Sequence, residues 1–136
     1  MNSIDIEKVL SHLYALRRDE IKLGLAHTFQ LLEVCGNPQK HFKAIHIAGT
    51  NGKGSTGKIL ASIFRQAGKS VGHYSSPHLI RFNERICINN GTITDAYILN
   101  FMSNFKSAIS EINATYFEVT TALAFCYFRD NYIELA

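Results

Sequence analysis

A glycine-rich segment near the middle of the chain constrains the fold more than any other feature of the sequence. It reads Gly49-Thr-Asn-Gly-Lys-Gly-Ser-Thr56 and directly follows the short apolar run 43–48. After it, apolar residues recur at helical spacing as far as Gly68. A strand, a glycine loop and a helix in this order open a βαβ unit, whose crossover connection makes its two strands parallel. The segment 70–74 is the expected second strand.

The residue types in this loop are those that bind phosphate groups. Its three glycines allow the backbone to wrap closely around an anion, and the N–H groups at the following helix start then point at the phosphate oxygens. Lys53 supplies a positive charge for the β- and γ-phosphates, and Ser55 and Thr56 offer hydroxyl groups. The alternative is a glycine-rich turn whose serine only caps the helix. The flanking strand and helix favour the phosphate-binding interpretation.

The spacing within the loop differs from that of the common phosphate-binding loop. That pattern has a glycine five residues before the lysine and a serine or threonine directly after it. Here Ala48 occupies the first of these positions and Gly54 the second. A general kinase or GTPase loop is therefore disfavoured.

The periodicity of apolar residues predicts further elements on both sides of this unit. Helices are expected before the loop and near the C-terminus, the last of them almost entirely apolar and therefore buried on most sides. A hairpin is expected around Asn89-Asn90-Gly91, because Asn-Gly suits a tight turn. The expected helices are 4–18, 24–34, 95–112 and 115–130, the hairpin strands are 85–88 and 92–94, and residues 133–136 open another strand.

Composition indicates one packed domain without a membrane segment. The chain has 136 residues, of which 46% are hydrophobic and 18% charged, a balance that argues against disorder. Its longest apolar run, 122–128, is far shorter than the roughly 20 residues that span a bilayer. The N-terminus lacks the pattern of a signal peptide. Three separated cysteines without a CxxC pair fit a reducing compartment, so a cytoplasmic protein is expected.

Charge is concentrated in the middle of the chain. Residues 41–90 contain seven basic side chains and one acidic one, whereas the whole chain has a net charge of only +3. This local excess predicts an anionic ligand. It is too small and too interrupted for a nucleic-acid face, so no nucleic-acid partner is expected.

Several segments together resemble the folylpolyglutamate synthase and dihydrofolate synthase family, a branch of the Mur-type ligases. The segment Ala48–Ser55 resembles the ATP loop of that family, and Tyr74–Leu79 followed by Arg81–Arg85 resembles its loop after the second strand. Ile21–Leu25 and Thr115–Glu118 resemble two folate-side motifs. The resemblance covers essentially the whole chain, in the order of the family.

This resemblance implies a nucleotide site and a metal ligand. Ser76 would be a ligand of Mg²⁺, for which a hydroxyl oxygen is a suitable hard donor. Pro77 would favour an extended backbone at that serine. From the residues alone, an ordinary Ser-Pro turn is the simpler interpretation. The implied ATP-binding residues are Gly49, Thr50, Asn51, Gly52, Lys53, Gly54, Ser55 and Thr56, and Lys53 would be catalytic.

The resemblance also implies a pocket for pteroate or folate. Thr115 and Glu118 additionally have the spacing of a helix capping box, and both roles can be true at once. The sequence departs from the family at Lys22, where aspartate is frequent, and at His27, where arginine is common. The implied folate-binding residues are Ile21, Lys22, Leu23, Thr115, Tyr116, Phe117 and Glu118.

The implied fold is α/β, a P-loop-type three-layer domain with a mostly parallel sheet and helices on both faces. Within it the chain divides into a helical lead-in (1–42), the βαβ unit (43–80), and a hairpin with helices (81–136). The implied enzyme is a ligase, monomeric at full length, that uses ATP and Mg²⁺ to add L-glutamate to dihydropteroate or a folate through an acyl phosphate. This reaction belongs to folate biosynthesis.

The family's enzymes are much longer than this chain. The resemblance places a second magnesium ligand, a metal-side histidine, a modified lysine and the C-terminal domain after Ala136. We therefore expect residues 1–136 to be inactive alone. Two alternatives remain open at this point, a Mur-type ligase for a cell-wall precursor and a nucleotide-binding remnant without catalysis.

Overall fold

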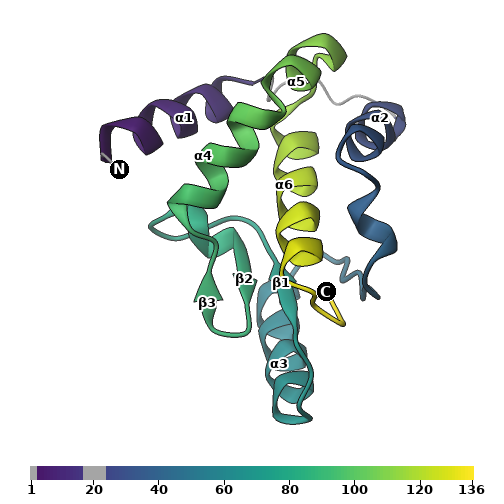
Figure 1. Cartoon of the computed structure of the whole chain (residues 1–136). Coiled ribbons are helices and arrows are strands. Elements are labelled where there is room, and N and C mark those ends of the chain that lie inside the picture. Colours follow the sequence, from purple (N-terminus) through teal and green to yellow (C-terminus); the bar gives the residue numbers. More distant parts are fainter. Residues whose placement is uncertain (1–2, 17–23) are drawn as a thin grey trace. The chain divides into compact units, whose positions relative to one another are not determined.

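The computed structural model describes residues 3–16 and 24–136, which form parts of two compact units (Figure 1). The first unit contains residues 1–38 and 95–126, and the second contains residues 39–94 and 127–136. Within the described residues, no helix has both the length and the apolar character needed to cross a membrane.

The first unit is built from helices. α1 (Ser3–Ala15) contacts α4 (Asp95–Asn104), and α2 (Ala26–Val34) contacts α5 (Lys106–Ile112). The greater part of α6 (Tyr116–Asp130) completes the unit. The core is formed by side chains that are fully buried, namely Leu13, Leu31, Ile98, Val119, Ala122 and Leu123.

Within the described residues, the expected helices of this unit are confirmed with one change. The single helix expected over 95–112 is divided into α4 and α5 at Phe105, whose N–H still donates to the carbonyl of Phe101 (3.0 Å). The break is therefore a local irregularity, and the apolar spacing alone predicts one continuous helix. The end expected for the first helix, at residues 17 and 18, lies outside the described residues.

The second unit contains α3 (Lys53–Gln66) and three short strands, β1 (Gly72–Tyr74), β2 (Ile86–Ile88) and β3 (Gly91–Thr92). The strands form an antiparallel sheet in the order β1-β2-β3, in which His73 lies opposite Cys87. The expected hairpin is confirmed, and its turn is Asn89-Asn90, with Asn89 at a φ of 52°.

The mostly parallel sheet expected from the sequence is not what these three strands form. Among the residues that the structure describes, parallel pairing is limited to Leu135, which bridges to Lys43 on one side and to Val71 on the other. The run 43–48 is therefore not a continuous strand. The bonds of this run to other described backbone groups involve Lys43 and Ile45, whose N–H donates to the carbonyl of Ala136 (2.9 Å).

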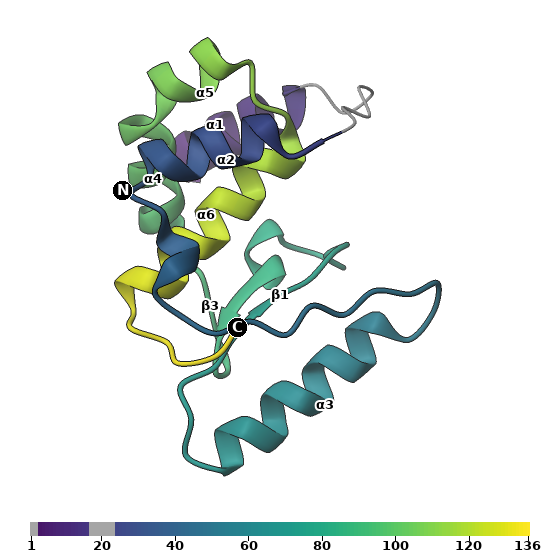
Figure 2. The same cartoon turned by 90° about the vertical axis from the view of Figure 1, so that its right-hand side faces the viewer.

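Both faces of β1 are covered within the second unit. Successive side chains of a strand point to opposite faces. A Cβ atom at Gly72 would meet Phe128 and Ile133, whereas His73 lies against Gly57 of α3. Figure 2 shows α3 lying along one side of this unit.

Gly68, expected just past the end of α3, adopts a φ of 81° and donates its N–H to the carbonyl of Arg65 (2.9 Å).

Candidate nucleotide-binding site

The glycine loop leads directly into the N-terminus of α3. Gly49 has a φ of 153° and Gly52, the N-cap residue, a φ of 76°, values that favour glycine over any residue with a side chain. Gly52 has no side chain with which to cap the helix. The first N–H groups of α3 therefore remain donors for an anion.

Lys53, the first residue of α3, folds its side chain back over the loop. Its Nζ donates hydrogen bonds to the carbonyl oxygen of Gly49 and to that of Thr50 (3.4 Å). All residues from 49 to 56 are exposed to solvent. A ligand can therefore approach the ammonium group and the helix N-terminus from solution.

A second loop, residues 75–81, follows β1 and carries Ser76. The segments 43–45 and 70–72 both run parallel to 134–136. The glycine loop and the second loop therefore follow the carboxyl ends of two chain segments that flank 134–136 and point the same way, and Figure 2 shows both on the same side of this unit. In open α/β sheets, ligands bind at this edge.

Glu84 organises the second loop. Its carboxylate accepts hydrogen bonds from the backbone N–H groups of Leu79 (2.9 Å), Ile80 (3.1 Å) and Arg81 (2.7 Å). These bonds, first those from Arg81 and Leu79, lower the pKa of the Glu84 carboxyl below its usual range. Glu84 belongs to the motif Arg81–Arg85, which by itself predicts no role for this carboxylate. The available signal was that Glu84 is the single acidic residue between 41 and 90.

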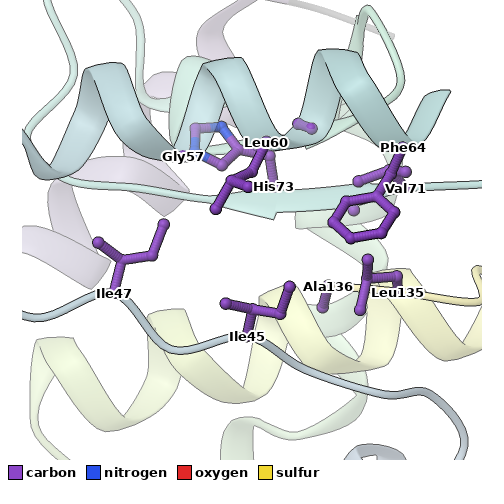
Figure 3. Close-up of a pocket in the computed structure, with 11 residues that line it drawn as sticks. Ile45, Ile47, Gly57, Leu60, Phe64, Val71, His73, Leu135 and Ala136 are labelled. Atoms are coloured by element: carbon purple, nitrogen blue, oxygen red, sulfur yellow. The ribbon is translucent and has the colours of Figure 1, made fainter. Parts of the chain in front are cut away.

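An apolar cavity of about 40 Å³ lies beneath α3 (Figure 3). Ile45, Ile47 and Leu135 line it from one side, and Gly57 and His73 border it on the other. Burial, together with the positive charge of Lys58, lowers the pKa of His73 below its usual value. The cavity is too small and too apolar for a nucleotide. It is a packing feature behind the glycine loop.

The four residues of the second folate-side motif have different surroundings. The predicted capping box is confirmed, since Thr115 N–H donates to Glu118 Oε2 (2.7 Å) and Glu118 N–H to Thr115 Oγ1 (3.3 Å). Tyr116 is buried and stacks on Tyr14, with ring centroids 5.7 Å apart. Phe117 is 62% exposed. Phe117 is therefore the member of this motif that can meet a ligand from solvent.

The other predicted site residues are placed only in part. Ile21, Lys22 and Leu23 lie outside the described residues. Ser76 is exposed and forms a cis peptide bond with Pro77. Among residues 3–16 and 24–136, no group of three or more His, Cys, Asp or Glu side chains could hold a metal ion.

The fold and the loop define an α/β protein with a glycine-rich loop at the start of a helix. In sequence, the chain is 40% identical over 113 residues to folylpolyglutamate synthase of Lacticaseibacillus casei, covering 78% of this chain and 26% of that one. It is 39% identical over 116 residues to dihydrofolate synthase/folylpolyglutamate synthase of Bacillus subtilis, covering 81% and 27%. No protein-family model matches the chain.

Solved structures of folylpolyglutamate synthases also resemble this chain. The folylpolyglutamate synthase of Thermotoga maritima has a TM-score of 0.88 and 35% identity, covering 98% of this chain and 32% of that one. A folylpolyglutamate synthase in complex with AMPPCP and folate has a TM-score of 0.90 and 34% identity, covering 100% and 34%. The chain is thus strongly homologous, in sequence and structure, to the folylpolyglutamate synthase / dihydrofolate synthase family. It spans about a quarter to a third of the length of these relatives.

Proposed function

We propose that the chain is the ATP-binding part of a longer ligase that adds L-glutamate to dihydropteroate or to a folate. The observation that carries this proposal is the exposed glycine loop at the start of α3, in a chain whose relatives are folylpolyglutamate and dihydrofolate synthases. The structural relative that holds AMPPCP and folate supports both ligand classes.

In this proposal, residues 49–56 bind the phosphates of ATP. The backbone N–H groups at the start of α3 donate to phosphate oxygens, and the hydroxyl groups of Ser55 and Thr56 lie within the same helical turn. Lys53 exchanges its bonds to the carbonyls of Gly49 and Thr50 for bonds to the β- and γ-phosphates. The exposed position of the lysine makes this exchange possible without unpacking a core.

The proposed reaction has two steps. A carboxylate oxygen of the folate attacks the γ-phosphorus of ATP, so that ADP leaves and an acyl phosphate forms. The amine of glutamate then attacks the acyl carbon, phosphate leaves, and the nitrogen loses a proton to give an amide. Lys53 and the loop N–H groups stabilise negative charge on the transferred phosphoryl group, which is the main catalytic contribution expected in phosphoryl transfer.

We propose Ser76 as a magnesium ligand. The described residues provide this one hydroxyl oxygen and no cluster of carboxylates, whereas Mg²⁺ requires near-octahedral coordination. These residues therefore do not form a complete magnesium site by themselves. The remaining ligands would be ATP, water and residues of the longer ligase.

We place the pteroate or folate at Phe117, with Thr115, Tyr116 and Glu118 fixing the start of α6 behind it. Ile21–Leu23 would form the opposite wall. In the longer protein, we propose that residues 43–48 and 133–136 are strands of a mostly parallel three-layer sheet. The two parallel bridges at Leu135 support this arrangement.

A cell-wall ligase is not favoured, because the relatives compared are folate-linked synthases. Glutamate-dependent ADP release, measured in the longer protein with dihydropteroate, with folate and with a UDP-sugar peptide, separates these functions. Release with dihydropteroate or folate supports the proposal, and release only with the UDP-sugar peptide contradicts it.

A further inference from the structure

Glu84 binds three consecutive backbone N–H groups with a single carboxylate. Oε1 accepts from Ile80 and Arg81, and Oε2 accepts from Leu79, all within 3.1 Å. Hydrogen bonds from N–H groups to a charged acceptor are roughly twice as strong as those between neutral groups. The carboxylate is therefore the common acceptor of three successive N–H groups of the loop.

Burial of apolar side chains does not explain the shape of this loop. Leu79 is 89% exposed and Ile80 87% exposed. Side chains this exposed contribute little hydrophobic stabilisation to the loop. Its order depends on polar contacts, among which is the bond from Arg85 Nε to His78 Nδ1 (2.7 Å).

The backbone around Glu84 is anchored in the second unit. Phe82 and Asn83 are buried, and Asn83 Nδ2 donates to the carbonyl of Ile93 (2.7 Å). The N–H of Ser75 donates to the carbonyl of Arg85 (2.9 Å), which closes the base of the loop. Both ends of residues 76–84 are thus fixed, and the carboxylate ties the middle of the loop to the anchored end.

We infer that Glu84 is a positioning residue that sets the place of Ser76 at the edge of the nucleotide site. This inference rests on the proposed function for the role of Ser76. Glu84 itself touches no substrate in this arrangement. It acts through the backbone of residues 79–81, and removing the carboxylate releases the loop that carries the serine.

The test uses the 136-residue chain with Glu84→Ala, Glu84→Gln and, as a matched control, the exposed Glu111→Gln. Amide hydrogen exchange by NMR reports the bonds at residues 79–81, and the amide chemical shifts of Ser76 and His78 report the position of the loop. In Glu84→Ala we expect exchange at residues 79–81 to rise at least about tenfold and the Ser76 shift to move. Glu84→Gln, which keeps one acceptor oxygen, should show a smaller change, and Glu111→Gln none.

Two outcomes overturn the inference. One is unchanged exchange at residues 79–81 in Glu84→Ala. The other is faster exchange there with an unmoved Ser76 amide. If Glu84→Ala does not fold, the test is a pH titration of the wild-type chain followed by NMR. The amide shifts of residues 79–81 should then change together, with a pKa below the usual glutamate range. Shifts that change independently or not at all contradict the positioning role of Glu84.

The test is separate from that of the proposed function. Binding of Mg·ATP to the wild-type chain is measured by calorimetry on the same samples. Failure of this chain to bind concerns its incomplete magnesium site and not the role of Glu84, which the amide measurements still test. Where the wild type binds, Glu84→Ala should weaken binding in the presence of Mg²⁺ more than in its absence, and an equal loss in both conditions counts against positioning of Ser76.

Discussion

Gly72 in β1 lies directly against the ring of Phe128 near the end of α6. A Cβ atom at residue 72 would lie 2.7 Å from two carbons of that ring and 2.8 Å from Cδ1 of Ile133. Phe128 is fully buried and packs edge-to-face with Phe42, with ring centroids 5.8 Å apart. The glycine therefore allows the end of α6 to approach β1 within the second unit.

Gly72→Ala should lower the free energy of unfolding by about 1–3 kcal/mol, because the added methyl group overpacks a site whose neighbours have little room to move. Urea denaturation measures the change. Gly54→Ala is the control, since a Cβ there meets nothing within 4 Å. It lies in the first turn of α3, where alanine should leave the stability unchanged or raise it by up to about 1 kcal/mol. Equal stability of the two variants would contradict the packing argument.

The sequence was informative about elements whose signal is local. Helical periodicity located α2, α3 and α6, and the Asn-rich turn located the hairpin. The sheet was predicted less well, because its parallel bridges join Leu135 to Lys43 and to Val71, residues far apart in the chain. Which segments pair over such separations depends on the packing of the whole unit. No local pattern carries that information.

The candidate site also contains some residues that a local sequence pattern predicts and others whose surroundings only the structure gives. The composition of the glycine loop predicts phosphate binding by residues 49–56, which stays a prediction. Thr115 and Glu118 had the spacing of the capping box that the structure confirms. The exposure of Phe117 beside a buried Tyr116 could not be read from the motif, since it depends on the neighbours of α6. The bonds of Glu84 depend on the conformation of a loop without a periodic pattern.

His73 should make stability depend on pH. Its pKa in the folded chain is lowered by burial and by Lys58, so the unfolded chain binds the proton more readily. The free energy of unfolding that His73 contributes is complete above the pKa of this group in the unfolded chain, about 6.5. It decreases as the pH falls from that value toward the lower pKa of His73 in the folded chain. The slope contributed is at most about 1.4 kcal/mol per pH unit.

Chemical denaturation of the wild type and of His73→Gln between about pH 7 and pH 5 measures this effect. The variant should lose less stability on acidification than the wild type. A parallel decline in the two proteins would show that His73 is protonated equally in the folded and unfolded states.

The capping and ligand roles of residues 115–118 can be separated. Thr115→Ala removes a cap from α6 and should lower the free energy of unfolding by about 1 kcal/mol. Phe117→Ala removes an exposed ring and should change stability by less than about 0.5 kcal/mol. In the longer ligase, Phe117→Ala should weaken folate binding and leave ATP affinity nearly unchanged. Equal losses for both ligands would argue against a folate wall at Phe117.

Lys53→Ala tests the ATP loop in the longer ligase. The lysine contacts only carbonyl groups of its own exposed loop in the bonds described, so thermal stability should change little. Turnover should fall about a hundredfold, which corresponds to a loss of roughly 3 kcal/mol of transition-state stabilisation. Lys53→Arg, which keeps the charge, is the matched control. Near-normal turnover of Lys53→Ala would remove the catalytic assignment.

Residues 1–136 alone should show no glutamate-dependent ADP release with ATP, Mg²⁺ and folate. The chain spans only about a quarter to a third of its relatives, and the carboxylates that could substitute for a missing metal ligand have other partners. Glu118 accepts the N–H of Thr115 in the capping box, and Glu134 pairs with Lys69 at 2.9 Å. A coupled ADP assay on the purified chain measures this directly, with the longer ligase as the positive control. Turnover by the short chain would show that its own residues complete the site. Glu118→Gln and Glu134→Gln would then identify which carboxylate leaves its present partner to do so.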